Sequence, residues 1–541
     1  MRDHHLYARM SILIPALLSA IVLAASYRVP ALTHDSVTYL QIARNVLTGG
    51  ELGWQALWAP PFHSLLIAAA SYGSGVHDLL LVVSLLAPLT CFLLVITVYL
   101  LAEELFDRTV AVMAASLCGL SPHLVNIAYS PEPEITYTAL LTVSLLLYLR
   151  AVVRHSSGYA ALSGVAFALA YMSRSEGVLI LVFVLAATAW TRRRIIGHAP
   201  LRRVYLVTIL LFSLVSLPYL VFLARNYGAV VISPKTSYVI SWLKHAELQI
   251  QDAENPDIWG MDRSGKLNWQ VPKGIADLLA PFLAEPRKNI SRYLHGLATE
   301  IPGRIPNGSG MDRYPQLIPF YLFAAALASL FVPWGEHRKE KRAVLFAPLL
   351  IVFVLPLFTS GWWKYLVPYF PLVTIAAAKG FAGWGEWIGS RAGGGLLRFV
   401  PVAVCAGAVI LIGGRYVYRL IPAAGHPGPM SLKNIEKAQY ADVTRNLGMA
   451  ARSFFGPGRN YMAKWSKTIY YLDGRWTPFP LGSHDDVIAY ARKHTVDYIV
   501  LEINDPQKMK SVHNPLPGVS LVKTFESQEY IYMLAFFRVL D

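Results

Sequence analysis

The sequence is dominated by a series of apolar runs, most of which approach the roughly 20 residues that an α-helix needs to cross a bilayer. Of the 541 residues, 55% are hydrophobic and 15% are charged, whereas a typical soluble domain has about 25% charged residues. Backbone N–H and C=O groups find no partners in hydrocarbon, so runs of this length favour helices. The sequence therefore predicts a polytopic α-helical membrane protein.

Eleven transmembrane helices are predicted, at residues 10–27, 79–101, 109–121, 135–150, 160–172, 177–190, 204–223, 316–332, 343–359, 364–382 and 396–414. The run Pro61–Tyr72 is too short to span and follows a polar, tryptophan-bearing loop. We expect it to form a helix at the membrane interface. The first run is long for a signal peptide and lacks a clear cleavage site, so we interpret it as the first membrane helix.

Basic residues between the runs predict the orientation of the chain. With the N-terminus inside, the outer connections at 122–134, 173–176 and 360–363 contain a single basic residue, Arg174. If Pro61–Tyr72 also spanned, every later loop would change sides and the bias toward inside positive charge would invert. The inside loops hold Arg150, Arg154, Arg192, Arg193, Arg194, Arg202, Arg203, Arg338, Lys339, Lys341, Arg342, Arg391 and Arg398.

Two domains are predicted. Residues 1–421 form the transmembrane domain, with outer loops at 28–78 and 230–314, and Ile275–Leu297 in the second loop is a possible amphipathic helix. Residues 422–541 lose the membrane pattern and predict a small α/β domain outside the cytoplasm. Its expected elements are a helix at Asp485–His494, a strand at Tyr498–Leu501 and a strand within Tyr530–Phe537.

Charge and cysteine content exclude some functions. The formal net charge is +15, but the basic residues lie mostly in short loops between apolar runs, as membrane orientation requires, and not in a nucleic-acid-binding patch. Cys91, Cys118 and Cys405 all lie inside apolar segments. None of them is therefore placed to form a loop disulfide or a metal cluster.

Ionisable residues gather at the predicted outer helix ends, where a charge near hydrocarbon is costly unless it is used or paired. The groups are His34-Asp35-Ser36, Glu132-Pro133-Glu134, Arg174-Ser175-Glu176, and the cationic group of Arg225-Asn226 and Lys364-Tyr365. Each also has a purely structural alternative. These are, in the same order, a helix cap, a favourable interaction with the helix dipole, mutual neutralisation of charge and anchoring at the membrane interface.

Acids and bases on one face beside lipid suit a reaction on a phosphate-bearing lipid. Cations stabilise a leaving phosphate, and a carboxylate takes the proton from an attacking hydroxyl group. Asp35 with Glu132 or Glu134 would form an acidic pair that could hold a divalent metal or position an acceptor hydroxyl; for the metal, we favour Asp35 and Glu134.

The order of these motifs resembles the GT-C glycosyltransferases, in particular the branch of the protein O-mannosyltransferases and the lipid A aminoarabinose transferase. The resemblance covers about residues 30–540, and each motif is short. The residues that carry it are His34-Asp35-Ser-Val-Thr-Tyr39-Leu-Gln-Ile-Ala43-Arg-Asn, Pro60-Pro61-Phe62-His63, Ser130-Pro-Glu132-Pro-Glu134, Arg174-Ser-Glu176-Gly177, Arg225-Asn226 and Lys364-Tyr365-Leu366-Val367-Pro368.

The resemblance implies a GT-C fold and roles for individual residues. Asp35 would be the catalytic base, Glu132 or Glu134 would contribute to the site or its metal, and Lys364 would contact the lipid phosphate. This chain departs from many relatives in having Ser36 where they have a second acid and Lys364 where they commonly have arginine, whose fork lysine cannot reproduce. We further predict donor-phosphate binding by Arg225 and Arg174, and substrate contacts by His34, Tyr39, His63, Glu176, Asn226 and Tyr365.

The predicted function is inverting transfer of a sugar from a polyprenyl-phosphate donor to a glycan, lipid or protein acceptor outside the cell membrane. The expected location is the inner membrane, as a multi-pass protein with its C-terminal domain outside. A transporter or lipid flippase, or a non-catalytic partner in an envelope pathway, is the alternative. Transporters, however, place polar groups at mid-membrane and often carry inverted repeats, and no repeat is visible here.

Overall fold

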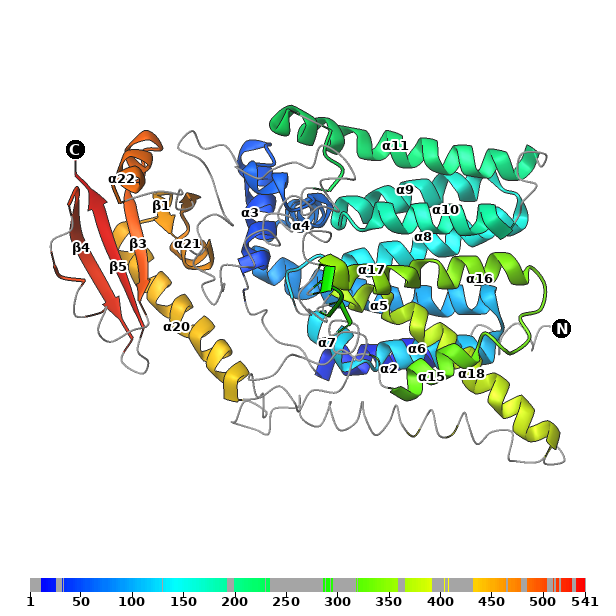
Figure 1. The fold of residues 1–541 in the computed structure, drawn as a ribbon. Coiled ribbons are helices and arrows are strands. Elements are labelled where there is room, and N and C mark those ends of the chain that lie inside the picture. The colour runs from blue at the N-terminus through cyan, green and yellow to red at the C-terminus, as the bar shows by residue number, and fades with distance from the viewer. Residues whose placement is uncertain are drawn as a thin grey trace. The chain divides into compact units, whose positions relative to one another are not determined.

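The computed structural model describes most of the chain in two compact units (Figure 1). Unit 1 comprises the described residues of 1–30, 45–233 and 285–431, and unit 2 those of 31–44, 234–284 and 432–541. Apart from isolated positions and short stretches, the described residues are 11–25, 34–128, 130–191, 199–228, 230–233, 320–358, 365–391, 432–463, 466–477, 484–503, 517–527 and 532–540.

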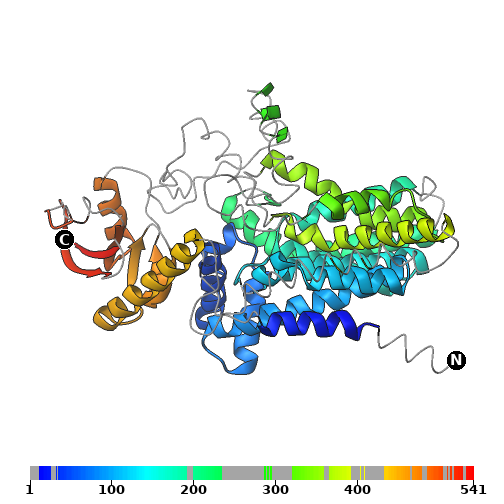
Figure 2. The same cartoon turned by 90° about the horizontal axis from the view of Figure 1, so that it is seen from below.

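Unit 1 is built from helices, most of which run side by side along their length (Figures 1 and 2). Helix α3 (His34–Gly49) is divided between the units: its residues up to Arg44 belong to unit 2, and those from Asn45 belong to unit 1. The other helices of unit 1 are α2 (Leu13–Ala25), α4 (Phe62–Ser74), α5 (Leu79–Leu105), α6 (Arg108–Gly119), α7 (Pro122–Ile127), α8 (Glu134–Arg154), α9 (Ser157–Ser173), α10 (Gly177–Thr191), α11 (Ala199–Tyr227), α15 (Phe320–Ala328), α16 (Arg338–Phe346), α17 (Ile351–Phe358) and α18 (Phe370–Arg391), with 3-10 turns η1 (Trp54–Leu57), η4 (Pro348–Leu350) and η6 (Val367–Tyr369).

Three of the described helices, α5, α8 and α11, are long and apolar enough to cross a membrane, and α2, α6 and α10 are shorter apolar helices. Helices overlap ten of the eleven predicted spans, and the span at 396–414 lies almost entirely outside the described residues. The predicted number of crossings therefore stays a prediction. The helix α4 has 13 residues, and its place at the membrane interface stays a prediction.

Contacts between helices mark the two ends of the helix bundle in unit 1. Helix α8 begins at Glu134 and ends at Arg154, a length of 21 residues or about 30 Å. At its final turns, the Arg150 Nε and the Arg154 Nη2 lie 2.8 and 3.0 Å from the carboxylate of Glu104 at the end of α5. At its first residue, Glu134 meets Arg174, which follows the end of α9. The acid–base motifs of α8 and α9 therefore lie at the same end.

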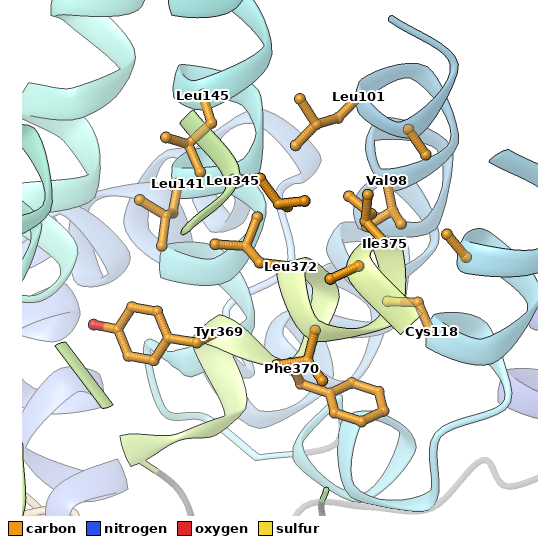
Figure 3. Packing of buried hydrophobic residues seen from close by; sticks show 14 of the residues in the cluster. Val98, Leu101, Cys118, Leu141, Leu145, Leu345, Tyr369, Phe370, Leu372 and Ile375 are labelled. Carbon is orange, nitrogen blue, oxygen red and sulfur yellow. The ribbon is translucent and has the colours of Figure 1, made fainter. Parts of the chain in front are cut away.

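The core of unit 1 lies between α5, α6, α8 and α18 (Figure 3). Leu101 of α5, Leu145 of α8 and Ile375 of α18 are fully buried there, together with Cys118 of α6. Among the described cysteines, Cys91 and Cys118 are both free and buried. Cys91 lies in α5 and Cys118 in α6, inside apolar segments as predicted.

Glycine permits a close approach between α15 and α18. A Cβ atom at Gly380 would collide with the carbonyl oxygen of Ala325 and lie 2.7 Å from its carbonyl carbon. Because small residues let helix backbones approach closely where lipid provides no hydrophobic driving force, this contact suits a bundle in a membrane.

Unit 2 contains a five-stranded mixed sheet in the order β2-β1-β3-β5-β4. The strands β2, β1 and β3 are parallel, and β5 pairs antiparallel with both β3 and β4. The elements are α20 (Leu432–Phe455), β1 (Asn460–Ala463), α21 (Ser466–Leu472), β2 (Arg475–Thr477), α22 (His484–Lys493), β3 (Tyr498–Ile503), β4 (Val519–Glu526) and β5 (Met533–Val539).

The expected C-terminal elements are confirmed at α22, β3 and β5, within a few residues at each end. Apolar packing on both faces stabilises the sheet. All the residues of β5 from Met533 to Phe537 are buried. The Phe455 ring of α20 lies 4.6 Å from the rings of Tyr498 and Phe536, measured between ring centroids. Most of the outer loop 230–314 lies outside the described residues. Within the possible amphipathic helix at Ile275–Leu297, the described positions 286–287, 289–291 and 293–294 are helical.

Candidate functional site

A buried arginine lies at the centre of the candidate site in unit 1. Arg174 follows the last residue of α9 and leads through Ser175 and Glu176 into α10. The connection is tight, because a Cβ atom at Gly177 would lie 2.8 Å from the backbone nitrogen of Tyr171. The sequence Arg-Ser-Glu-Gly therefore turns the chain sharply and directs the guanidinium into the protein, where its side chain is 2% exposed.

Two carboxylates bind this guanidinium. Its Nη1 lies 2.5 Å from Glu134 Oε1, and its Nη2 lies 2.9 Å from Glu176 Oε1. Burial alone disfavours the Arg174 cation, but the attraction of Glu176 and then of Glu134 outweighs it and raises the pKa of Arg174 above its usual range. The arginine is therefore a permanent cation between two acids.

Tyrosines line the same cluster. The Arg174 guanidinium lies 4.8 Å from the centre of the Tyr365 ring and 6.0 Å from that of Tyr137, within reach of a cation–π contact. The hydroxyl groups of Tyr137 and Tyr369 are 3.4 Å apart. Tyr137 and Tyr369 were not among the predicted site residues. For Tyr137 the available signal was its spacing, because it follows Glu134 by three residues on α8 and residues three apart share a helix face.

His63 joins the cluster from α4. Its Nδ1 lies 2.9 Å from the hydroxyl oxygen of Thr136 on α8, and the side chain is buried. Burial lowers the pKa of His63 from 6.5 to about 4, although the negative charge of Glu134 opposes this shift. The imidazole is therefore neutral at neutral pH and fixes α4 against the first turn of α8.

Glu134 presents its second carboxylate oxygen without a partner. The side chain is 4% exposed, and among the described residues no hydrogen-bond donor reaches Oε2. Glu132, two residues earlier, is also buried. The two predicted acids of this motif therefore both lie in the protein interior, at the end of the bundle that holds Arg174.

Hydrogen bonds tie neighbouring segments to this end of unit 1. The Tyr171 hydroxyl donates to the carbonyl of Ile232 at 2.6 Å, and Ser233 donates to the hydroxyl oxygen of Ser175 at 3.1 Å. The Tyr227 hydroxyl donates to the carbonyl of Leu57 at 2.9 Å. The end of α11 and the residues after it are thereby joined to η1 and to the connection that carries Arg174.

The first acidic motif belongs to α3. Asp35 is in the first turn and is half-buried, and Tyr39 is buried one turn later. Within unit 2, Arg44 lies 3.1 Å from Asp473 and stacks over the ring of Tyr470. Asp35 belongs to unit 2 and Glu134 to unit 1, so the pairing of these two acids across a shared cavity stays a prediction.

Of the remaining predicted residues, the two that the structure describes at the end of α11 do not join the cluster. Arg225 and Asn226 are exposed in the last turn of α11, and the Asn226 side-chain amide donates to the carbonyl of Phe222 on its own helix. Lys364 and the side chain of His34 lie outside the described residues. The predicted roles of these four residues are therefore not tested by the geometry.

The acids that are brought together here do not form a metal site by themselves. Across the described part of the chain, no group of three or more His, Cys, Asp or Glu side chains could hold a metal ion. Within the cluster, one oxygen of Glu134 and one of Glu176 already bind the Arg174 cation. The predicted metal site at Asp35 and Glu134 thus gains no support from the surroundings of Glu134.

The sequence was compared with known families and proteins. Residues 59–222 match the family described as dolichyl-phosphate-mannose-protein mannosyltransferase, a segment that contains His63, Glu134, Arg174 and Glu176. The comparison with curated proteins finds no match.

Solved structures share the fold across nearly the whole chain. ArnT from Cupriavidus metallidurans bound to undecaprenyl phosphate superposes with a TM-score of 0.56 and 13% identity, covering 97% of each chain. The Archaeoglobus fulgidus oligosaccharyltransferase in complex with Zn and sulfate gives 0.58 and 15%, covering 93% of this chain and 69% of that one. AglB from the same organism, with an inhibitory peptide and a dolichol-phosphate, gives 0.53 and 15%, covering 91% and 69%. The predicted resemblance is confirmed.

Proposed function

We propose that this chain, which resembles the GT-C glycosyltransferases in sequence and shares their fold, transfers a sugar from a polyprenyl-phosphate donor to an acceptor. The observation that carries the proposal is the buried cluster of Arg174, Glu134 and Glu176 inside the segment that matches the mannosyltransferase family. Buried charges are costly and concentrate at functional sites, so this cluster at one end of a helical bundle favours a reaction centre.

The proposed reaction is a single displacement at the anomeric carbon. The acceptor hydroxyl oxygen forms a bond to that carbon as the bond to the phosphate oxygen breaks, and polyprenyl phosphate leaves with the electron pair. Asp35 takes the hydroxyl proton as general base, and Lys364 and Arg225 stabilise the phosphate. Direct attack from the opposite side inverts the anomeric configuration. Most of the catalysis then comes from positioning, because a sugar phosphate is already an activated donor.

The comparison with solved structures supports the choice of lipid, and the distribution of basic residues supports the location of the reaction. ArnT is bound to undecaprenyl phosphate in one matching structure and AglB to a dolichol-phosphate in another, which supports a polyprenyl-phosphate donor here. The basic inside loops support a site on the outer face of the inner membrane, with unit 2 in the same compartment. The acceptor is a glycan, a lipid or a protein.

The test uses radiolabelled polyprenyl-phosphate sugars offered to membranes that contain the full chain and an extract of acceptors. Wild type should consume a donor and release polyprenyl phosphate, and Asp35→Asn should abolish transfer without loss of expression or thermal stability. Asp485→Asn, at an exposed aspartate of α22, is the matched control and should retain activity.

Two results would contradict the proposal. Full turnover by Asp35→Asn would remove this residue as the base. Movement of the labelled lipid across the membrane without release of polyprenyl phosphate would indicate a transporter or flippase instead.

A further inference from the structure

The contacts of Arg174 leave little of it for a phosphate group. Both terminal nitrogens bind carboxylates, at 2.5 Å to Glu134 and 2.9 Å to Glu176, and the Tyr365 ring covers the guanidinium at 4.8 Å. A phosphate that took both of these N–H groups in parallel would have to displace the two acids. Binding a lipid phosphate in that way would break two charge-assisted hydrogen bonds in a buried site.

The charge of the cluster also disfavours an anion. Among the described residues, two carboxylates surround one guanidinium and His63 is neutral at neutral pH, so these groups together carry an excess of negative charge. An incoming phosphate would meet this excess in a low-dielectric interior, where like charges repel strongly. The site instead suits a ligand that donates hydrogen bonds.

Glu134 Oε2 is available for such a ligand. Glu134 Oε2 is buried, and no donor among the described residues reaches it, whereas Oε1 of the same carboxylate is held by Arg174. A buried carboxylate oxygen without a partner costs more than a satisfied one, so a donor that arrives with the substrate regains that energy. Arg174 fixes the carboxylate so that Oε2 keeps one position.

We propose that Glu134 Oε2 accepts a hydrogen bond from a hydroxyl group of the sugar, and that Arg174 is a positioning residue for this carboxylate and does not bind the donor phosphate. The proposal rests on the proposed function, because it assigns the substrate group that this site contacts. It separates two tasks: the cluster recognises the sugar, and cations elsewhere hold the lipid phosphate.

The experiment compares binding of two lipids to the full chain in detergent. One is polyprenyl phosphate; the other is the polyprenyl-phosphate sugar that binds wild type most tightly among a panel of hexose- and pentose-linked lipids. Because hydrogen bonds to charged groups are strong, Glu134→Gln should weaken the sugar-linked lipid about tenfold and leave polyprenyl phosphate within about twofold. Arg174→Lys should do the same, since the carboxylate loses its fixed position.

The ratio of the two affinities is the readout, because a purely structural defect would weaken both lipids together. Glu336→Gln, at an exposed glutamate distant in sequence from the cluster, is the matched control and should change neither affinity. If Glu134→Gln does not fold, Glu134→Asp, which withdraws the carboxylate by one methylene group, is measured in the same way.

Several results would overturn the proposal. Arg174→Lys weakening polyprenyl phosphate as much as the sugar-linked lipid would make Arg174 a phosphate ligand. Unchanged affinities in Glu134→Gln would mean that an internal water already satisfies Oε2. Equal binding of both lipids by wild type would remove any contact with the sugar. Failure of the transferase itself would appear differently, as wild type that binds the lipids but never releases polyprenyl phosphate.

Discussion

The arginine between two carboxylates defines the site at the scale of single residues. Removing one partner of a buried pair leaves an uncompensated charge, so each of Arg174, Glu134 and Glu176 depends on the others. The Glu132-Pro133-Glu134 and Arg174-Ser175-Glu176 motifs were predicted to lie at the same helix ends, and their side chains are in contact. The role suggested for Arg174, a contact to the donor phosphate, is not the one that its contacts favour.

His63 should make stability depend on pH. Burial lowers its pKa to about 4 in the folded protein, against 6.5 when exposed, so the unfolded chain binds more protons between these values. Stability from this residue is complete above pH 6.5 and is lost as the pH falls toward 4, by an amount on the order of 3 kcal/mol. Thermal unfolding in detergent across this range measures the loss.

The comparison for this prediction is His63→Gln, which keeps a polar side chain but removes the titrating group. Its unfolding temperature should fall less steeply between pH 6.5 and pH 4 than that of wild type. Parallel curves for the two proteins would show that His63 does not remain neutral in the folded state.

Most of the site residues that could be predicted from the sequence are ionisable, and the uncharged tyrosines and threonine beside them were mostly missed. Glu134, Arg174, Glu176, Tyr365 and His63 were predicted as site residues and share one cluster. Tyr137, Tyr369 and Thr136 were missed, because tyrosine and threonine are common in membrane helices and only the packing of α8 against η6 and α4 brings them together.

At the scale of elements, glycine decides how closely helices pack. The approach of α15 to α18 at Gly380 leaves no room for a methyl group, since the added carbon would lie 2.7 Å from the carbonyl carbon of Ala325. Overpacking of this kind costs about 1–3 kcal/mol. Gly380→Ala should therefore lower the unfolding temperature in detergent by several degrees.

Gly73 in α4 provides the control for this prediction. A Cβ atom there would meet nothing within 4 Å, and alanine is a better helix former than glycine. Gly73→Ala should be neutral or slightly stabilising. Equal losses at the two positions would mean that the contact with Ala325 does not set the effect.

Helices were predictable because their apolar runs are long, and short strands were not. The run at 79–101 became α5, at Leu79–Leu105, and the pattern at 498–501 became β3. By contrast β1 has four residues and β2 has three, too few to show an alternating pattern. Their place beside β3 depends on long-range pairing that no local pattern encodes.

At the scale of the whole molecule, the two ends of unit 1 predict a sidedness. Glu134 and Arg174 lie at one end, and Glu104 with Arg150 and Arg154 lies at the other. Labelling of single cysteines tests this sidedness, in a variant that lacks Cys405 because Cys91 and Cys118 are buried. In that variant, His77→Cys, just before α5, should react with an impermeant maleimide in intact cells. Lys339→Cys at the start of α16 should react only after the membrane is opened, because the basic loops are expected inside.

The two positions are both exposed, so each controls for the reactivity of the other. Labelling of both in intact cells would place them in one compartment and contradict the predicted crossings. Labelling of Lys339→Cys alone would invert the orientation and move the candidate site to the cytoplasmic side.

The bond between Arg174 and Glu134 joins segments 40 residues apart in sequence, at the start of one helix and in the turn between two others. Substitution of only one of the two residues is disfavoured, because the other would remain as a buried charge without its partner. Lineages that lose one of the two residues should lose the other in the same step. Sequences related to this protein should therefore carry Arg174 and Glu134 together or lack both.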